Sequence, residues 1–168
     1  IYKLEKEYVT ELKSDEIMFI LQIAPDHPER TTLSEALVRK NFTNAYTFIE
    51  LNPLHPQAKF IIEMMFDRDP NIATLLLKEK MDHAQVESIF EGIYGIEAKC
   101  IRKMMPDALI FILEVAPDHK YAKTMVAVLV EKNYIKAFDF VKENDSHPHS
   151  EFMKELIIRK KQSLKPLL

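Results

Sequence analysis

A 28-residue repeat is the feature that most constrains how this chain can fold. The segment Phe19–His27 recurs almost unchanged as Phe111–His119. A shorter period lies inside, marked by histidines at 28-residue intervals with one longer gap of 36: His27, His55, His83, His119 and His147. Repeats of about 20 to 50 residues are typical of proteins built from stacked supersecondary units. We therefore number every unit so that its histidine occupies position 28.

The apolar residues follow the same register. Positions 9, 10, 18, 21 and 22 are apolar in all five full units; position 21, for example, holds Ile20, Phe48, Leu76, Ile112 and Phe140. Positions 18, 21 and 22 have the spacing of one helix face, and positions 9 and 10 belong to a second helical stripe. Pro70 and Pro106 share position 15, where proline is tolerated in a first helical turn. Each unit therefore predicts two short helices joined by a tight turn.

The predicted fold is all-α: a right-handed solenoid of stacked antiparallel helix hairpins, with roughly 11–12 helices and no sheet. It forms one domain over residues 1–168, in the units 1–27, 28–55, 56–83, 84–119, 120–147 and a partial unit 148–168. The fourth unit carries eight extra residues near Ala84–Gly95, where both glycines of the chain lie, and we expect an added or extended helix there. The chain begins with Ile1, so we expect it to be part of a longer protein.

Composition excludes several classes of partner. Hydrophobic residues make up 47% of the 168 residues, and the net charge is −3. This balance is typical of soluble globular proteins and predicts neither nucleic-acid binding nor membrane insertion. The single cysteine, Cys100, cannot form an internal disulfide and suits a reducing compartment, so we expect the protein to be cytoplasmic.

Three segments resemble known repeat families. Asn41–Ala58, with Ala45, Phe48 and Pro53, is similar to the second half of a tetratricopeptide repeat, although the period of 28 is shorter than in that family. Asn71–Asp82, and more loosely Lys132–Asn144, resembles the second helix of an ankyrin repeat. These resemblances imply a solenoid of helical hairpins, for which protein binding is the usual role.

The five repeated histidines allow two interpretations. Aspartates precede three of them (Asp26, Asp82 and Asp118), and imidazole with carboxylate could bind a metal ion. Packed helices, however, lie about 8–10 Å apart, whereas zinc needs nitrogen ligands at about 2 Å. We therefore expect no metal site. Instead, each aspartate should cap the following helix and each histidine should bind loop carbonyl groups.

No catalytic constellation is visible in the sequence. Cys100 occupies core position 9, which favours a buried structural cysteine over a nucleophile. The methionines Met64, Met65, Met104 and Met105 are either core residues, as their register favours, or part of a flexible binding groove. Motifs for phosphate binding, zinc hydrolysis or serine hydrolysis are absent from the sequence, so we expect neither an enzyme nor a cofactor.

A non-catalytic protein–protein interaction module is the function that these observations favour. A stack of hairpins presents an extended surface to a protein or peptide segment. Aromatic side chains outside the five core positions are the predicted contact residues: Tyr46, Tyr94, Tyr121 and Phe138. A structural or regulatory arm of a larger protein is the alternative, and an enzyme ranks third.

Overall fold

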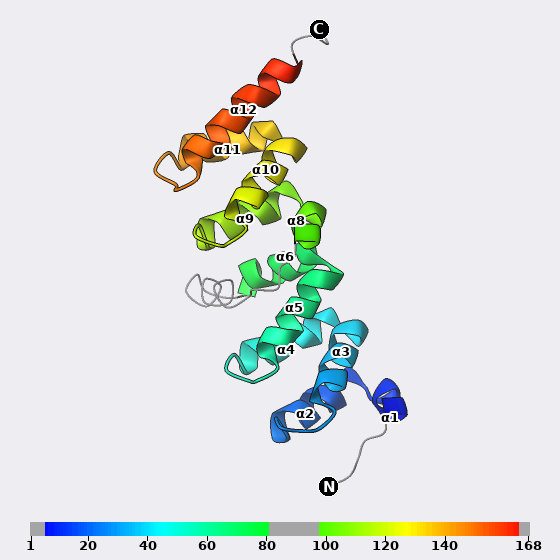
Figure 1. The fold of residues 1–168 in the computed structure, drawn as a ribbon. Coiled ribbons are helices and arrows are strands. Elements are labelled where there is room, and N and C mark those ends of the chain that lie inside the picture. Colours follow the sequence, from blue (N-terminus) through cyan, green and yellow to red (C-terminus); the bar gives the residue numbers. More distant parts are fainter. Residues whose placement is uncertain (1–5, 81–97, 165–168) are drawn as a thin grey trace.

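A computed structural model describes residues 6–80 and 98–164, and every regular element in these two ranges is an α-helix (Figure 1). The predicted all-α class is therefore confirmed for the described residues, which contain no strand. The helices are α1 (Lys6–Glu11), α2 (Ser14–Ile23), α3 (Arg30–Lys40), α4 (Phe42–Leu51), α5 (Ala58–Arg68), α6 (Pro70–Lys80), α8 (Ala98–Lys103), α9 (Pro106–Val115), α10 (Ala122–Lys132), α11 (Tyr134–Glu143) and α12 (Ser150–Leu164). The predicted insertion at Ala84–Gly95 lies outside these ranges.

The helices pack mainly against their neighbours in sequence. Helix α3, for example, contacts α2, α4 and α5, and α10 contacts α9, α11 and α12. The result is an elongated series in which α1 and α12 lie at opposite ends (Figure 1). None of the helices in the described ranges combines the length and apolar character that crossing a membrane requires.

The 28-residue register predicted from the sequence sets the helix boundaries. The second helix of each full unit begins at position 15: Ser14, Phe42, Pro70, Pro106 and Tyr134. Pro70 and Pro106 thus start helices, as predicted. Two other second helices, α4 and α11, have side-chain caps. Asn41 and Asn133 each accept a hydrogen bond at 3.0 Å from the backbone N–H three residues later. Such caps satisfy donors that the first helical turn leaves open.

The repeated apolar positions form one core cluster. Positions 10, 18 and 22 are buried in all five full units. At position 21, Phe48, Ile112 and Phe140 are buried, whereas Ile20 and Leu76 are partly buried and pack against the core. Position 9 is the weakest of the five, because Tyr8 is 58% exposed on α1 at the end of the series.

Polar contacts between neighbouring units also repeat in register. The Lys40 ammonium donates to the Thr10 carbonyl oxygen at 2.6 Å, and the Arg68 guanidinium donates to the equivalent carbonyl of Val38, one unit later. A second pair of contacts joins consecutive second helices. Asn44 donates to Asp15 at 2.8 Å, and Lys136 forms an ion pair with Asp107. Adjacent units are therefore fixed to one another by polar contacts as well as by the apolar core.

Candidate functional site

An apolar groove lies between the second helices α6 and α9. We call it the α6/α9 groove; its volume is about 270 Å³, and it is lined by Asn71, Ile72, Thr74, Leu75, Lys78, Met105, Asp107, Ala108 and Phe111. Ile72, Leu75 and Met105 are 45%, 52% and 63% exposed. Large apolar side chains gathered around a hollow are typical of a contact surface, whereas singly exposed ones are ordinary.

Polar side chains hold the rim of the groove in place. The Asn71 side chain accepts from the backbone N–H of Met105 at 2.6 Å and donates to the Lys103 carbonyl at 3.4 Å. It thereby ties the start of α6 to the turn that precedes α9. The Lys78 ammonium lies 5.6 Å from the centre of the Phe111 ring and forms no ion pair with a described residue. The Lys78 ammonium at the rim could therefore bind a carboxylate of a partner.

The groove opens because Thr74 occupies position 19 of its unit. In the preceding unit that position holds Tyr46, which is buried against residues of α5 and α6 that include Ala73 and Leu77. Thr74 is much smaller, and its hydroxyl donates back to the Pro70 carbonyl at 2.7 Å. The space between α6 and α9 is consequently left unfilled.

Tyr46 is not a surface contact residue, and that prediction is wrong. Its side chain is 1% exposed because α4, α5 and α6 close around it. Burial, and secondarily the negative charge of Glu50, raises the pKa of the Tyr46 phenol to about 12. Position 19 lies outside the five repeated apolar columns because it holds Thr74 in the third unit, so the column pattern alone could not reveal that Tyr46 is buried.

The other predicted contact residues are not brought together in one site. Tyr121 is partly buried against the core at the start of α10, and Phe138 on α11 is 48% exposed. Tyr94 lies outside the described residues. The groove was missed by the sequence reasoning, although one signal was present. Ile72 and Leu75 stand at positions 17 and 20, where the preceding unit has Asn44 and Thr47.

The histidines bind backbone groups, but their repeated contacts are with N–H groups and not with the loop carbonyl groups that were predicted. In four loops the Nδ1 atom accepts a hydrogen bond from the backbone N–H two residues later, at 3.1 to 3.2 Å: His27, His55, His119 and His147. The Nδ1 acceptor role assigns the ring hydrogen to Nε2. The Nε2 atoms of His55 and His147 lie 3.0 and 2.9 Å from the carbonyl oxygens of Leu21 and Leu113, in the preceding unit.

Proline explains why these two carbonyls need a histidine. The α-helical donor to the Leu21 carbonyl would be residue 25, and the donor to the Leu113 carbonyl would be residue 117. Both are prolines, Pro25 and Pro117, which carry no backbone N–H. The histidine of the next unit therefore supplies the missing donor and links two units in the same contact.

The predicted aspartate caps are wrong. The residues that precede α3 and α10 are Glu29 and Tyr121, and neither side chain caps its helix. Asp26 and Asp118 are exposed in the loops, and Asp82 lies outside the described ranges. The Nδ1 atoms of His27 and His119 instead accept from the backbone N–H groups of Glu29 and Tyr121, the residues immediately before α3 and α10. Within residues 6–80 and 98–164, no three His, Cys, Asp or Glu side chains gather where they could hold a metal ion.

Cys100 and two of the four methionines are core residues, as their register predicted. Burial raises the pKa of the Cys100 thiol, whose sulfur lies 3.8 Å from Asp67. A raised pKa disfavours the thiolate, the form a nucleophile needs. Met65 and Met104 are buried, whereas Met105 is exposed and lines the groove.

Comparisons with known proteins do not add a family. No family model, curated protein or solved structure matches this chain.

Proposed function

We propose that the chain is a helical-repeat solenoid that binds other proteins, and that the α6/α9 groove is a contact site for them. The groove itself carries the proposal. It collects exposed apolar side chains from two consecutive second helices, at positions where the preceding unit has polar ones. An exposed apolar surface lowers the solubility of a protein. Exposed apolar side chains that surround a groove are therefore typical of interaction sites.

The chemistry of the groove defines the segment that would bind it. The lining of Ile72, Leu75 and Phe111 suits a large apolar side chain, which gains about 25 cal/mol for each Å² of apolar surface removed from water. Lys78 at the rim suits a carboxylate, because its ammonium pairs with no described acidic group. The partner is therefore a protein segment that presents a large apolar residue with an aspartate or glutamate close to it.

The repeat architecture supports the same conclusion. Stacked hairpins present consecutive second helices side by side, which creates extended surfaces between them. The similarity of Asn41–Ala58 to tetratricopeptide repeats, and of Asn71–Asp82 to ankyrin repeats, favours protein binding over catalysis.

Selection of displayed random peptides on the whole chain tests this function. The key variant carries Ile72→Asn and Leu75→Thr, which are the residues of the preceding unit at these positions. A matched control carries Ile23→Asn and Ile135→Thr, two comparably exposed apolar residues on other second helices.

Selected peptides should combine large apolar and acidic residues. They should bind the groove variant at least about tenfold more weakly than the wild type. This corresponds to a loss of binding free energy of roughly 1.4 kcal/mol or more. The control variant should bind like the wild type. Failure to enrich any peptide, or equal binding by the groove variant, would contradict the proposal.

A further inference from the structure

Helices α11 and α12, the last two of the described residues, carry a second exposed apolar surface. Phe138 on α11 and Ile158 on α12 are 48% and 55% exposed, and we call them, with Glu155 and Lys161, the end surface. The Lys161 ammonium lies 4.9 Å from the centre of the Phe138 ring, which joins the two helices within this surface. The end surface is separate from the α6/α9 groove.

The equivalent positions in other units show how buried these side chains are elsewhere in the chain. Phe138 occupies position 19, and the residues at this position in α4 and α6 are buried. Ile158 occupies position 11, where the equivalents in α3, α5 and α10 are at most 4% exposed: Val38, Phe66 and Val130. The pattern is not uniform, because Arg102 at position 11 of α8 is exposed and Ile110 at position 19 of α9 is partly buried. The end surface nevertheless continues the established interface between units, without covering helices among the described residues.

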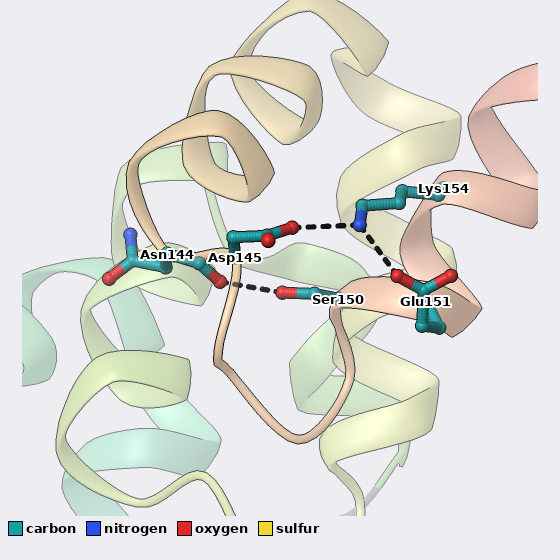
Figure 2. Close-up of polar contacts among 5 residues, drawn as sticks. All are labelled: Asn144, Asp145, Ser150, Glu151 and Lys154. Atoms are coloured by element: carbon teal, nitrogen blue, oxygen red, sulfur yellow. Dashed lines mark hydrogen bonds and ion pairs between the residues drawn. The ribbon is translucent and has the colours of Figure 1, made fainter.

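Helix α12 is anchored so that its outward face is fixed (Figure 2). The Lys154 ammonium binds Asp145 in the α11–α12 loop at 2.8 Å and Glu151 at 2.6 Å. These hydrogen bonds raise the pKa of Lys154, and its bond to Asp145 lowers the pKa of that carboxyl. The Ser150 hydroxyl donates to the Asn144 carbonyl at 2.6 Å. The first turn of α12 is thus held to the preceding loop.

Glu155 lies 3.9 Å from Arg159 on the same helix, in an exposed ion pair. The order of Glu155 and Lys161 about Ile158 is complementary to itself in one orientation only. Residues three positions away on a helix lie on the same face, which places Glu155 and Lys161 on either side of Ile158. Two copies of α12 that cross antiparallel at Ile158 bring each Glu155 opposite the other copy's Lys161. A parallel arrangement would instead bring like charges together.

We propose that the end surface binds a second copy of this chain, with two α12 helices antiparallel about a two-fold axis at Ile158. A two-fold interface requires a surface that complements itself, and the order Glu155–Ile158–Lys161 has that property. The second α12 then runs antiparallel to the first, the direction a second helix takes within a unit. It covers Phe138 and Ile158 as neighbouring units cover their equivalents.

The dimer is expected to be weak. Helix α12 has 15 residues, and stable complexes usually bury about 800 Å² on each partner, which is more than one short helix face provides. Sedimentation velocity of the whole chain, over micromolar to millimolar concentrations, should show a reversible monomer–dimer equilibrium. A wild-type chain that stays monomeric throughout would overturn the proposal.

A pair of substitutions separates this interface from others. Ile158→Glu should weaken the dimer at least tenfold, because it buries a carboxylate beside its symmetry mate. Ile23→Glu is the control, since Ile23 is 64% exposed on α2 near the opposite end of the molecule (Figure 1). That variant should dimerise like the wild type. A dimer that survives Ile158→Glu, or that is lost in the groove variant instead, would overturn the assignment.

Charge reversal tests the antiparallel arrangement. Glu155→Lys places two lysines opposite each other in a homodimer, and Lys161→Glu places two glutamates opposite each other. Each variant alone should therefore be monomeric, while an equimolar mixture should form a heterodimer. Circular dichroism should show unchanged helix content in both variants. A mixture that remains monomeric while both variants stay folded would refute the two-fold pairing.

Discussion

The α4/α6 and α6/α9 junctions share one register, yet one is closed and the other is open. At the first, Tyr46 is buried against α5 and α6 and leaves no room for a water molecule. At the second, Thr74 occupies the equivalent position and the α6/α9 groove remains. The two junctions differ in the side chain at position 19 and in chain length, because eight extra residues separate α6 from α9. The volume of the position-19 side chain therefore contributes to whether a junction is sealed or open.

Replacing Tyr46 by threonine gives the largest expected effect, because it copies the open junction into the closed one. Tyr46→Thr should lower the free energy of unfolding by about 3 kcal/mol through lost burial and a new cavity. Urea denaturation followed by circular dichroism measures the change. Thr47→Ala, at the next position of α4, is the control. A loss below about 1 kcal/mol would mean that the helices close the gap without Tyr46.

Removing His55 tests the polar contacts that join units. His55→Ala should cost about 2–3 kcal/mol, because the Leu21 carbonyl loses its donor and the edge contact with Phe48 is lost. His27→Ala should cost less, since the Nδ1 atom of His27 binds the Glu29 N–H within its own loop. Urea denaturation of both variants provides the comparison. Equal losses would show that the link between units adds nothing to stability.

Alkaline pH should weaken the closed junction. The pKa of Tyr46 is raised from 10.0 to about 12 in the folded chain, so its neutral form contributes stability below pH 10.0. That contribution, on the order of 2 kcal/mol, is lost as pH rises toward 12. Phenolate absorbance, taken as the difference between the wild type and Tyr46→Phe, should titrate near pH 12. A midpoint near 10 would contradict the buried environment.

The Tyr46 hydroxyl offers a smaller and opposite effect. Its oxygen is buried without a hydrogen-bond partner. Tyr46→Phe should therefore raise the free energy of unfolding by about 1 kcal/mol, because a buried unpaired polar group is removed and the ring is kept. Thermal and urea denaturation both report this gain. A loss of stability instead would show that the hydroxyl is satisfied in solution.

Substitutions in the α6/α9 groove should have little effect on the stability of the fold. The groove variant with Ile72→Asn and Leu75→Thr alters exposed side chains, so its free energy of unfolding should shift by less than about 1 kcal/mol, mostly through helix propensity. Urea denaturation checks the value. A large loss would mean that these residues stabilise the fold, and it would weaken their assignment to binding.

The sequence predicted the all-helical class and the buried helix faces well, because its periodicity reflects burial. Positions 10, 18 and 22 are apolar in every full unit and buried in every full unit. Pro70 and Pro106 also located two helix starts, since proline is favoured only in the first turn. These signals are local or strictly repeated, and a single sequence is sufficient to read them.

The candidate site was not predictable in the same way. Tyr46 appeared to be a surface aromatic because it falls outside the repeated columns, yet the following unit covers it. The groove depends on the size of Thr74 relative to Tyr46 and on the approach of α9, which are properties of packing between units. Asp26 and Asp118 were expected to cap helices by residue type, but Glu29 and Tyr121 are the residues that precede α3 and α10, and both aspartates are exposed in the loops.

The link from His55 to the Leu21 carbonyl has a consequence for synthesis on the ribosome. The two residues are 34 positions apart, and Pro25 leaves the end of α2 without its own donor. A nascent chain that stops short of His55 therefore exposes an incomplete helix end. The end of α2 is therefore completed only after the loop that carries His55, between α4 and α5, has emerged.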